Sequence, residues 1–249
     1  MDLQRFPGQA ENLLKSRMIH LVPEIEIRHT GTDQSFAQAQ SLLEFIRDGE
    51  TSQLKKLKIS GEILHVTPAI LAGAAMKLET LMTCLSRDQM EAIFIRIVAT
   101  EDSRLRELVN WVPVNISSLD PEVVAGALIK LETVGPQLSY SLSAGHLTAL
   151  FSRISQAPVL RLTRLDVFRK DLSLVPPEVL TGAIQKLEVV EFWWGKMTRE
   201  QTTAILTLAK ERRLGKIKNI RIYHVDGMRS VSPSLLQEAR LNAKLKWID

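Results

Sequence analysis

The sequence has little of what marks secreted or membrane-spanning proteins. It contains a single cysteine, Cys84, so no disulfide can form within the chain, whereas secreted repeat proteins usually close their ends with disulfides. Its longest apolar runs reach seven or eight residues, far short of the ~18 that a membrane-spanning helix needs. Residues 1–17 also lack the apolar segment of a signal peptide. These absences predict a cytoplasmic protein without a membrane partner.

The sequence also has no large excess of charge of either sign. The chain carries 32 basic and 28 acidic residues, well mixed along its length, for a net charge of +4. Nucleic-acid binding normally requires basic residues clustered on one face or along one helix. The composition therefore disfavours nucleic acid as a partner.

The sequence also lacks the residue patterns of catalytic, metal and cofactor sites. The five histidines are scattered without metal-binding spacing, and no glycine-rich phosphate loop occurs. Cys84 has no identifiable base, which predicts a packed thiol. Glutamates recur at Glu79, Glu132 and Glu188, but an intervening strand should hold them ~10 Å apart. We predict a protein that is not an enzyme and has no cofactor or metal; the alternative is an enzyme whose site is assembled from dispersed residues.

A long internal repeat is what the sequence does contain. A proline starts a short apolar helix at intervals of 53 to 56 residues, at Pro68, Pro121, Pro177 and Pro233. The first three copies have a glycine five residues later and then Lys-Leu-Glu. The isolated glycines inside these helices predict close packing against a neighbouring helix or strand. A period of this length is typical of a stacked array, which offers an extended surface for binding.

Each period contains two strands and two helices. Apolar residues at x-L-x-x-L-x-L spacing, such as Leu162, Leu165 and Val167, indicate short half-buried strands. The long helices begin with capping boxes, as at Ser86 and Thr198. This order predicts parallel strands on one side and helices on the other. The predicted strands begin at Leu57, Leu78, Leu108, Leu131, Leu165, Leu187, Ile220 and Leu245.

These strands and helices, over about residues 22–249, resemble leucine-rich repeat proteins of the α/β, ribonuclease-inhibitor-like class, which also occurs in nucleotide-binding innate-immune receptors. The resemblance implies an α/β horseshoe solenoid, with parallel strands on the concave face and helices on the convex face. It also implies protein binding, often across the concave face. The chain departs from that pattern because the strand-end asparagine positions hold other residues, and because Asn110 falls where an inward apolar residue is expected. The positions without asparagine are Glu62, Pro113, Lys170 and Val225.

The predicted organisation is one continuous domain. Residues 1–50 form an irregular N-terminal cap and half-repeat, with helices over 9–19 and 34–49 and a strand over 24–27. Residues 51–249 form repeats of alternating short and long lengths.

Charged side chains alternate across the predicted sheet. Strands with basic residues, including Arg164 and Arg221, lie between strands that carry Glu132 and Glu188. Side chains at matching positions of neighbouring strands can pair. The pattern predicts mutual neutralisation on a solvated sheet face, and it is also compatible with a mixed-sign surface that steers a partner.

Aromatic residues are only 5% of the chain, yet most of the large ones lie late in it. Three consecutive predicted strands each have an aromatic residue directly after their last inward residue: Phe168, Trp193 and Tyr223. This arrangement predicts a row of aromatic side chains beside the concave face. Trp247 is aligned with Val189, an outward position. Tryptophan, tyrosine and arginine dominate binding hot spots, so this row is the predicted partner-binding site. Alternatively, these aromatics cover an uncapped C-terminal end, through which the chain could self-associate.

The predicted function is therefore non-catalytic. The chain is expected to be a scaffold or adaptor that binds another protein through its concave strand face. The alternatives are the ligand-sensing C-terminal repeat region of a larger innate-immune-type receptor, or an enzyme inhibitor.

Overall fold

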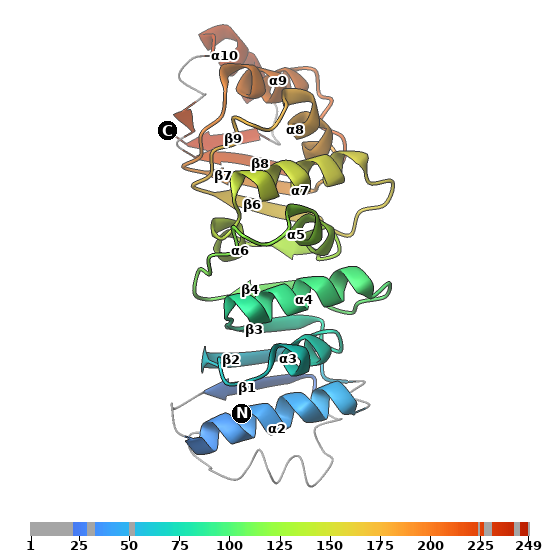
Figure 1. Cartoon of the computed structure of the whole chain (residues 1–249). Helices are drawn as coiled ribbons and strands as arrows, with labels where there is room; N and C mark the ends of the chain where they lie inside the picture. The colour runs from blue at the N-terminus through green and yellow to red at the C-terminus, as the bar shows by residue number, and fades with distance from the viewer. Residues whose placement is uncertain are drawn as a thin grey trace. The chain divides into compact units, whose positions relative to one another are not determined.

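The computed structural model describes residues 22–28, 33–49, 53–223, 225–226, 231–241 and 245–248. The helix predicted over 9–19 lies outside these residues. The chain divides into two compact units, Met1–Ile116 and Ser117–Asp249. Each unit contains parallel strands that alternate with helices along the chain (Figure 1). The coarse prediction of an α/β repeat with parallel strands is confirmed.

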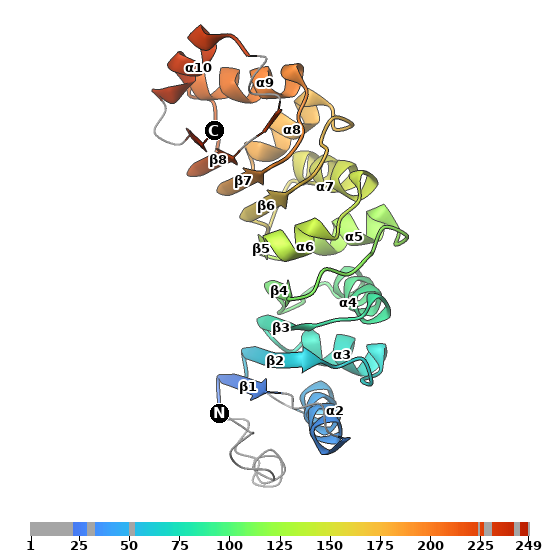
Figure 2. The same ribbon diagram turned by 90° about the vertical axis from the view of Figure 1, so that its left-hand side faces the viewer.

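The first unit pairs four parallel strands in chain order. Its helices lie side by side on one face of these strands (Figure 2). The strand predicted over 24–27 and the helix predicted over 34–49 are both present. The elements are β1 (Glu24–Arg28), α2 (Asp33–Asp48), β2 (Lys56–Glu62), α3 (Pro68–Ala75), β3 (Thr80–Cys84), α4 (Arg87–Ala99) and β4 (Glu107–Asn110).

The second unit repeats this arrangement. Its parallel strands pair in chain order from β5 to β9, and its longer helices pack against their neighbours on one side of the strands (Figure 2). The short helix α6 lies against β6. The elements are α5 (Pro121–Leu128), β5 (Thr133–Val134), α6 (Pro136–Tyr140), α7 (Ala144–Gln156), β6 (Arg164–Phe168), α8 (Pro177–Ile184), β7 (Val189–Trp193), α9 (Arg199–Lys210), β8 (Asn219–Tyr223), α10 (Pro233–Arg240) and β9 (Leu245–Ile248).

Alternation along each strand separates the core from the opposite sheet face. In β6, Leu165 and Val167 are buried toward the helices, and in β7 Phe192 occupies the corresponding place. Side chains at the intervening positions, such as Arg164 and Phe168, therefore lie on the face away from the helices. The predicted inward residues are confirmed because burial of apolar side chains selects one strand face.

The Lys-Leu-Glu strands begin later than predicted. Glu79, Glu132 and Glu188 come one residue before β3, β5 and β7, so their placement on the strands was wrong. The backbone explains the shift, because each of these carbonyls accepts two hydrogen bonds from the following repeat. For Glu188 the donors are the N–H groups of Lys218 and Asn219, at 2.7 and 3.2 Å. The preceding leucine is buried in each case.

In α4, α7 and α9 a buried polar side chain ties the helix to the loop before a preceding short helix. Gln201 is fully buried in α9, and its Nε2 donates to the carbonyls of Leu172 and Val175 at 2.6 and 2.5 Å. Gln89 in α4 makes the same pair of bonds to Ile63 and Val66 at 2.8 and 2.9 Å. These bonds satisfy the carbonyls of Val66 and Val175 and add a second donor to those of Ile63 and Leu172, which also accept from the Val66 and Val175 N–H groups.

His146 takes the same place in α7. Its Nδ1 accepts from the Ser143 N–H at 3.0 Å, so Nε2 carries the proton and donates to the Leu119 carbonyl at 3.0 Å. The Ser86 and Thr198 capping boxes are confirmed, and Ser143 forms a third with His146. Sequence analysis missed the third box because histidine replaces the usual glutamine.

Asn110 has a structural role that its sequence position did not reveal. It is buried at the end of β4, where its Oδ1 accepts from the Leu85 N–H at 2.9 Å and its Nδ2 donates to the Val112 carbonyl at 2.6 Å. The apolar residue expected there could satisfy neither group. An asparagine bridge between neighbouring turns therefore occurs at Asn110.

The close packing predicted at the repeated glycine is confirmed at Gly73. A Cβ on Gly73 would lie 2.7 Å from Cγ of Arg47, which belongs to the neighbouring helix α2. On Gly182 a Cβ would reach Cβ of Ser155 in α7 at 3.4 Å. The requirement for glycine is therefore stronger in α3 than in α8.

Candidate functional site

Aromatic side chains gather at the C-terminal ends of β6, β7 and β8. Phe168, Trp193 and Tyr223 are directly paired in register on these three strands. The rings of Trp193 and Tyr223 stack with centroids 3.7 Å apart and planes at 11°. The predicted aromatic row is therefore present, because parallel pairing places equivalent strand positions side by side.

Two further aromatic residues enlarge the row. Tyr140 ends α6 and lies 6.1 Å from Phe168 between ring centroids. Trp194 meets Phe168 edge to face at 5.5 Å and Trp193 at 6.0 Å. Tyr140 and Trp194 remain 45% and 46% exposed, so they present large apolar surfaces. We call these residues the aromatic platform: Tyr140, Phe168, Trp193, Trp194 and Tyr223.

Two basic residues lie among the rings of the platform. The guanidinium carbon of Arg169 is 5.4 Å from the Phe168 ring centroid and 5.5 Å from that of Trp194. Nζ of Lys170 lies 5.4 Å from the Tyr140 ring and donates to the Tyr140 carbonyl at 2.7 Å. Burial lowers the pKa of Lys170 below its ordinary value because desolvation disfavours the charged form.

Backbone strain coincides with the platform. Arg169 and Trp194 follow β6 and β7 directly and adopt left-handed φ angles of 52° and 48°. Their N–H groups donate to the carbonyls of Trp193 and Tyr223 at 2.7 and 2.8 Å, which continues the strand pairing past the turn. The left-handed conformation costs a residue with a side chain about 1–2 kcal/mol. Strained residues of this kind cluster at binding and catalytic sites.

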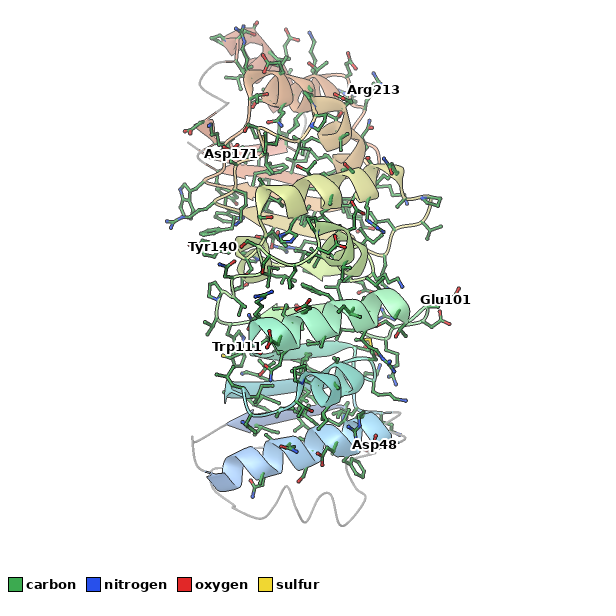
Figure 3. The ribbon with its side chains drawn as sticks, in the orientation of Figure 1. Asp48, Glu101, Trp111, Tyr140, Asp171 and Arg213 are labelled. Atoms are coloured by element: carbon green, nitrogen blue, oxygen red, sulfur yellow. The ribbon has the colours of Figure 1, made fainter. Side chains whose placement is uncertain are left out.

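The platform lies at one edge of the second unit. Figure 3 shows Tyr140 and Asp171 at that edge, with Arg213 at the opposite edge. Asp171 is paired with Lys196 at 3.5 Å, and an isolated bridge joins the same two residues. The turns that carry Arg169 and Lys170 are therefore held to the next repeat by backbone and side-chain contacts.

A charged layer lies on the same sheet face, two residues earlier on each strand. Asp166, Glu191 and Arg221 are in register on β6, β7 and β8. Oε1 of Glu191 accepts from both Arg164 and Arg221 at 3.1 Å, and Arg164 also contacts Asp166 Oδ1 at 3.1 Å. The two acidic side chains are only 6% and 3% exposed. The layer is therefore neutralised internally.

The predicted charge pairing occurs, partly with different partners. Lys218 binds Glu188 at 2.6 Å and Lys55 binds Glu79 at 3.4 Å. Arg164 and Arg221 instead bind Asp166 and Glu191, as described above. Sequence analysis missed Glu191 because its contacts with Arg164 and Arg221 depend on the register of β7 with β6 and β8. The available signal was an acidic residue between the two inward positions of β7.

The structure separates the predicted site residues into three groups. Phe168, Trp193 and Tyr223 belong to the platform, and Arg164 and Arg221 lie in the adjacent charged layer. Glu132 and Glu188 precede β5 and β7, so they are at the opposite, N-terminal ends of their strands. Tyr140 was missed because α6 lies between two strands and has no periodic signal.

The predicted alignment of Trp247 was wrong. In β9 its Cα pairs with Ile222, which pairs with Phe192, so it is not level with Val189. The prediction was shifted by three residues, because strand pairing places Leu245, and not a later residue, level with Val190. The structure describes the backbone of Trp247 but not its side chain.

Other kinds of site are not evident in the described part of the chain. Within these residues, no group of three histidine, cysteine, aspartate or glutamate side chains could hold a metal ion, and no described helix is long and apolar enough to cross a membrane. No protein-family model matches the sequence, and no similar sequence was found among curated proteins.

Removing the buried negative charge of Asp166 is expected to change stability in a pH-dependent way. Burial raises the pKa of Asp166 above its ordinary value of 3.8, against the opposing hydrogen bond from Arg164. The folded state then holds the proton more tightly, so wild-type stability declines as pH rises from that value through the folded-state pKa. Asp166→Asn should therefore gain stability relative to wild type as the pH rises above the ordinary aspartate pKa, as measured by urea denaturation over a pH series.

Glu191→Gln provides the contrast. It removes the charge that two arginines share and should lower the free energy of unfolding at neutral pH by about 1–3 kcal/mol. This loss of stability is smaller than for a fully buried ion pair, because the side chains of Arg164 and Arg221 are 44% and 38% exposed and can be hydrated instead. Equal losses for both variants at neutral pH would contradict this account of the layer.

Proposed function

We propose that this chain is a protein-recognition module built from leucine-rich-type α/β repeats. The strand spacing and the alternation of short and long helices support that repeat class, in which the strands would line a concave face. The absence of disulfide partners for Cys84 fits a reducing compartment such as the cytosol. The module would act by binding another protein rather than by catalysis.

The aromatic platform is the observation that carries this proposal. It brings two tryptophans, two tyrosines and a phenylalanine into contact in a chain that is only 5% aromatic. Clustered, half-exposed aromatic rings with a neighbouring arginine have the composition of binding hot spots. The neutralised layer of Asp166 and Glu191 beside the rings would add orientation more than attraction.

Because Trp194 has a left-handed backbone, a glycine substitution there can test whether its side chain serves binding or stability. Glycine adopts the left-handed conformation without steric cost, so Trp194→Gly should keep the free energy of unfolding within about 1 kcal/mol of wild type. Loss of the half-exposed indole should weaken partner binding by about tenfold or more. The two quantities can be measured by urea denaturation and by quantitative affinity capture from cell extract.

Arg212→Gly is the matched control. Arg212 also has a left-handed φ of 57°, but it follows α9, where Arg213 N–H donates to the Leu208 carbonyl at 2.9 Å. This variant should gain up to about 1 kcal/mol in stability and capture the same proteins as wild type. The double variant Trp193→Ala, Tyr223→Ala should lose those proteins. Unchanged capture by both platform variants would refute the proposed function.

A further inference from the structure

We propose that the aromatic platform binds an acidic, extended segment of a partner protein. Carboxylates of that segment would pair with Arg169 and Lys170, and its apolar side chains would pack on the rings. The inference rests on the proposed function and deepens it by naming the chemistry of the partner.

Uncompensated positive charge is the first argument. Several basic residues near the strands of the second unit have carboxylate partners, as Lys218 has in Glu188 and Lys196 in Asp171. Arg169 and Lys170 contact rings and a backbone carbonyl instead. Among the residues that the structure describes, neither pairs with a carboxylate. The platform therefore carries two positive charges that a partner can neutralise.

The surroundings of these cations strengthen their attraction for carboxylates. Lys170 is desolvated beside Tyr140, which lowers its pKa, so a carboxylate would restore stabilisation that water no longer supplies. Arg169 is held between the rings of Phe168 and Trp194 by its left-handed backbone. A guanidinium fixed in this way loses little freedom when it forms charge-assisted hydrogen bonds.

Ring spacing fits an extended chain. Centroids follow one another at 6.1, 5.5 and 6.0 Å from Tyr140 through Phe168 and Trp194 to Trp193. Side chains on one face of an extended strand recur about every 6.6–6.8 Å. Apolar side chains at two alternate positions could thus contact a neighbouring pair of rings, such as Tyr140 and Phe168, with acidic residues beside them meeting the two cations.

Single-stranded nucleic acid would also stack on aromatic rings, but the platform suits it less well. Backbone binding needs a track of several basic residues, and among the described residues of the platform Arg169 and Lys170 are the two cations without a carboxylate. In addition, one face of Trp193 is already covered by Tyr223 at 3.7 Å. A protein segment needs fewer charges and less ring surface.

Selection from a library of random dodecapeptides on the full chain tests the inference. Wild type should enrich aspartate and glutamate next to aromatic or aliphatic residues, and Arg169→Glu, Lys170→Glu should enrich lysine and arginine. A selected acidic peptide, followed by tryptophan fluorescence, should bind Arg169→Gln, Lys170→Gln about tenfold more weakly. The matched control Lys210→Gln, Lys218→Gln changes net charge equally at paired lysines and should bind within about twofold of wild type.

The outcomes separate the two proposals. Neutral or basic peptides that lose binding in Trp194→Gly would overturn the acidic inference and leave the proposed function standing. If no enriched peptide depends on the platform, or an oligothymidylate binds more tightly than every selected peptide, both proposals fail.

Discussion

Gly215→Ala is expected to lower the free energy of unfolding by about 2–4 kcal/mol, because both the backbone and the surroundings require glycine. Gly215 has a φ of +56°, and a Cβ placed there would lie 2.4 Å from the carbonyl oxygen of Gln185. That carbonyl cannot move away freely, since it accepts from the Lys216 N–H at 3.0 Å. Relief of the clash would therefore break the contact between the α9–β8 loop and the end of α8.

The same loop is held a second time by the side chain of Gln185, whose Nε2 donates to the Arg213 carbonyl at 2.7 Å. The substitution should thus release the whole turn before β8, and the Lys216 amide should exchange faster with solvent. Gly135→Ala is the matched control, because a Cβ at Gly135 would meet only Oε1 of Gln137 at 3.7 Å and its φ is −81°. Similar unfolding midpoints for the two variants in urea would contradict this explanation.

Gln201→Ala should cost about 3 kcal/mol, since it removes the partners of the Val175 carbonyl and the Thr198 N–H and one of the two donors to the Leu172 carbonyl. The amide of Gln201 donates to the carbonyls of Leu172 and Val175 and accepts from the Thr198 N–H at 2.8 Å. Alanine also leaves a cavity where the fully buried side chain was. Denaturation in urea measures the loss, and Gln156→Ala, at an exposed position of α7, should change stability by less than about 0.5 kcal/mol.

His146 gives a second, independent test of the same role. Glutamine occupies the equivalent place in α4 and α9, so His146→Gln should retain most of the stability that His146→Ala loses. If glutamine were as damaging as alanine, the histidine would have a role other than tying Leu119 and Ser143 to the helix.

The order of the elements followed from local patterns in the sequence. Apolar alternation identified inward residues such as Val190 and Ile220, and proline at the first helical position marked the starts of α3, α5, α8 and α10. These signals are reliable because burial of one strand face and helix capping depend on residues a few positions apart.

The site depended on longer-range packing. Tyr140 meets Phe168 only because α6 lies against β6, and nothing in the sequence of α6 indicates that contact. Glu191 receives two arginines because three strands align in one register. The left-handed turns at Arg169 and Trp194 likewise occur at residues with no intrinsic preference for that conformation.

The sequence by itself thus determined the α/β repeat, its buried positions and the aromatic row of Phe168, Trp193 and Tyr223. Only the tertiary structure decided which side chains join that row and which charges are left without a carboxylate. The physical reason is that periodicity specifies which face of an element is buried, whereas loop length and strand register determine the contacts between elements. The misalignment of Trp247 by three residues shows the same limit.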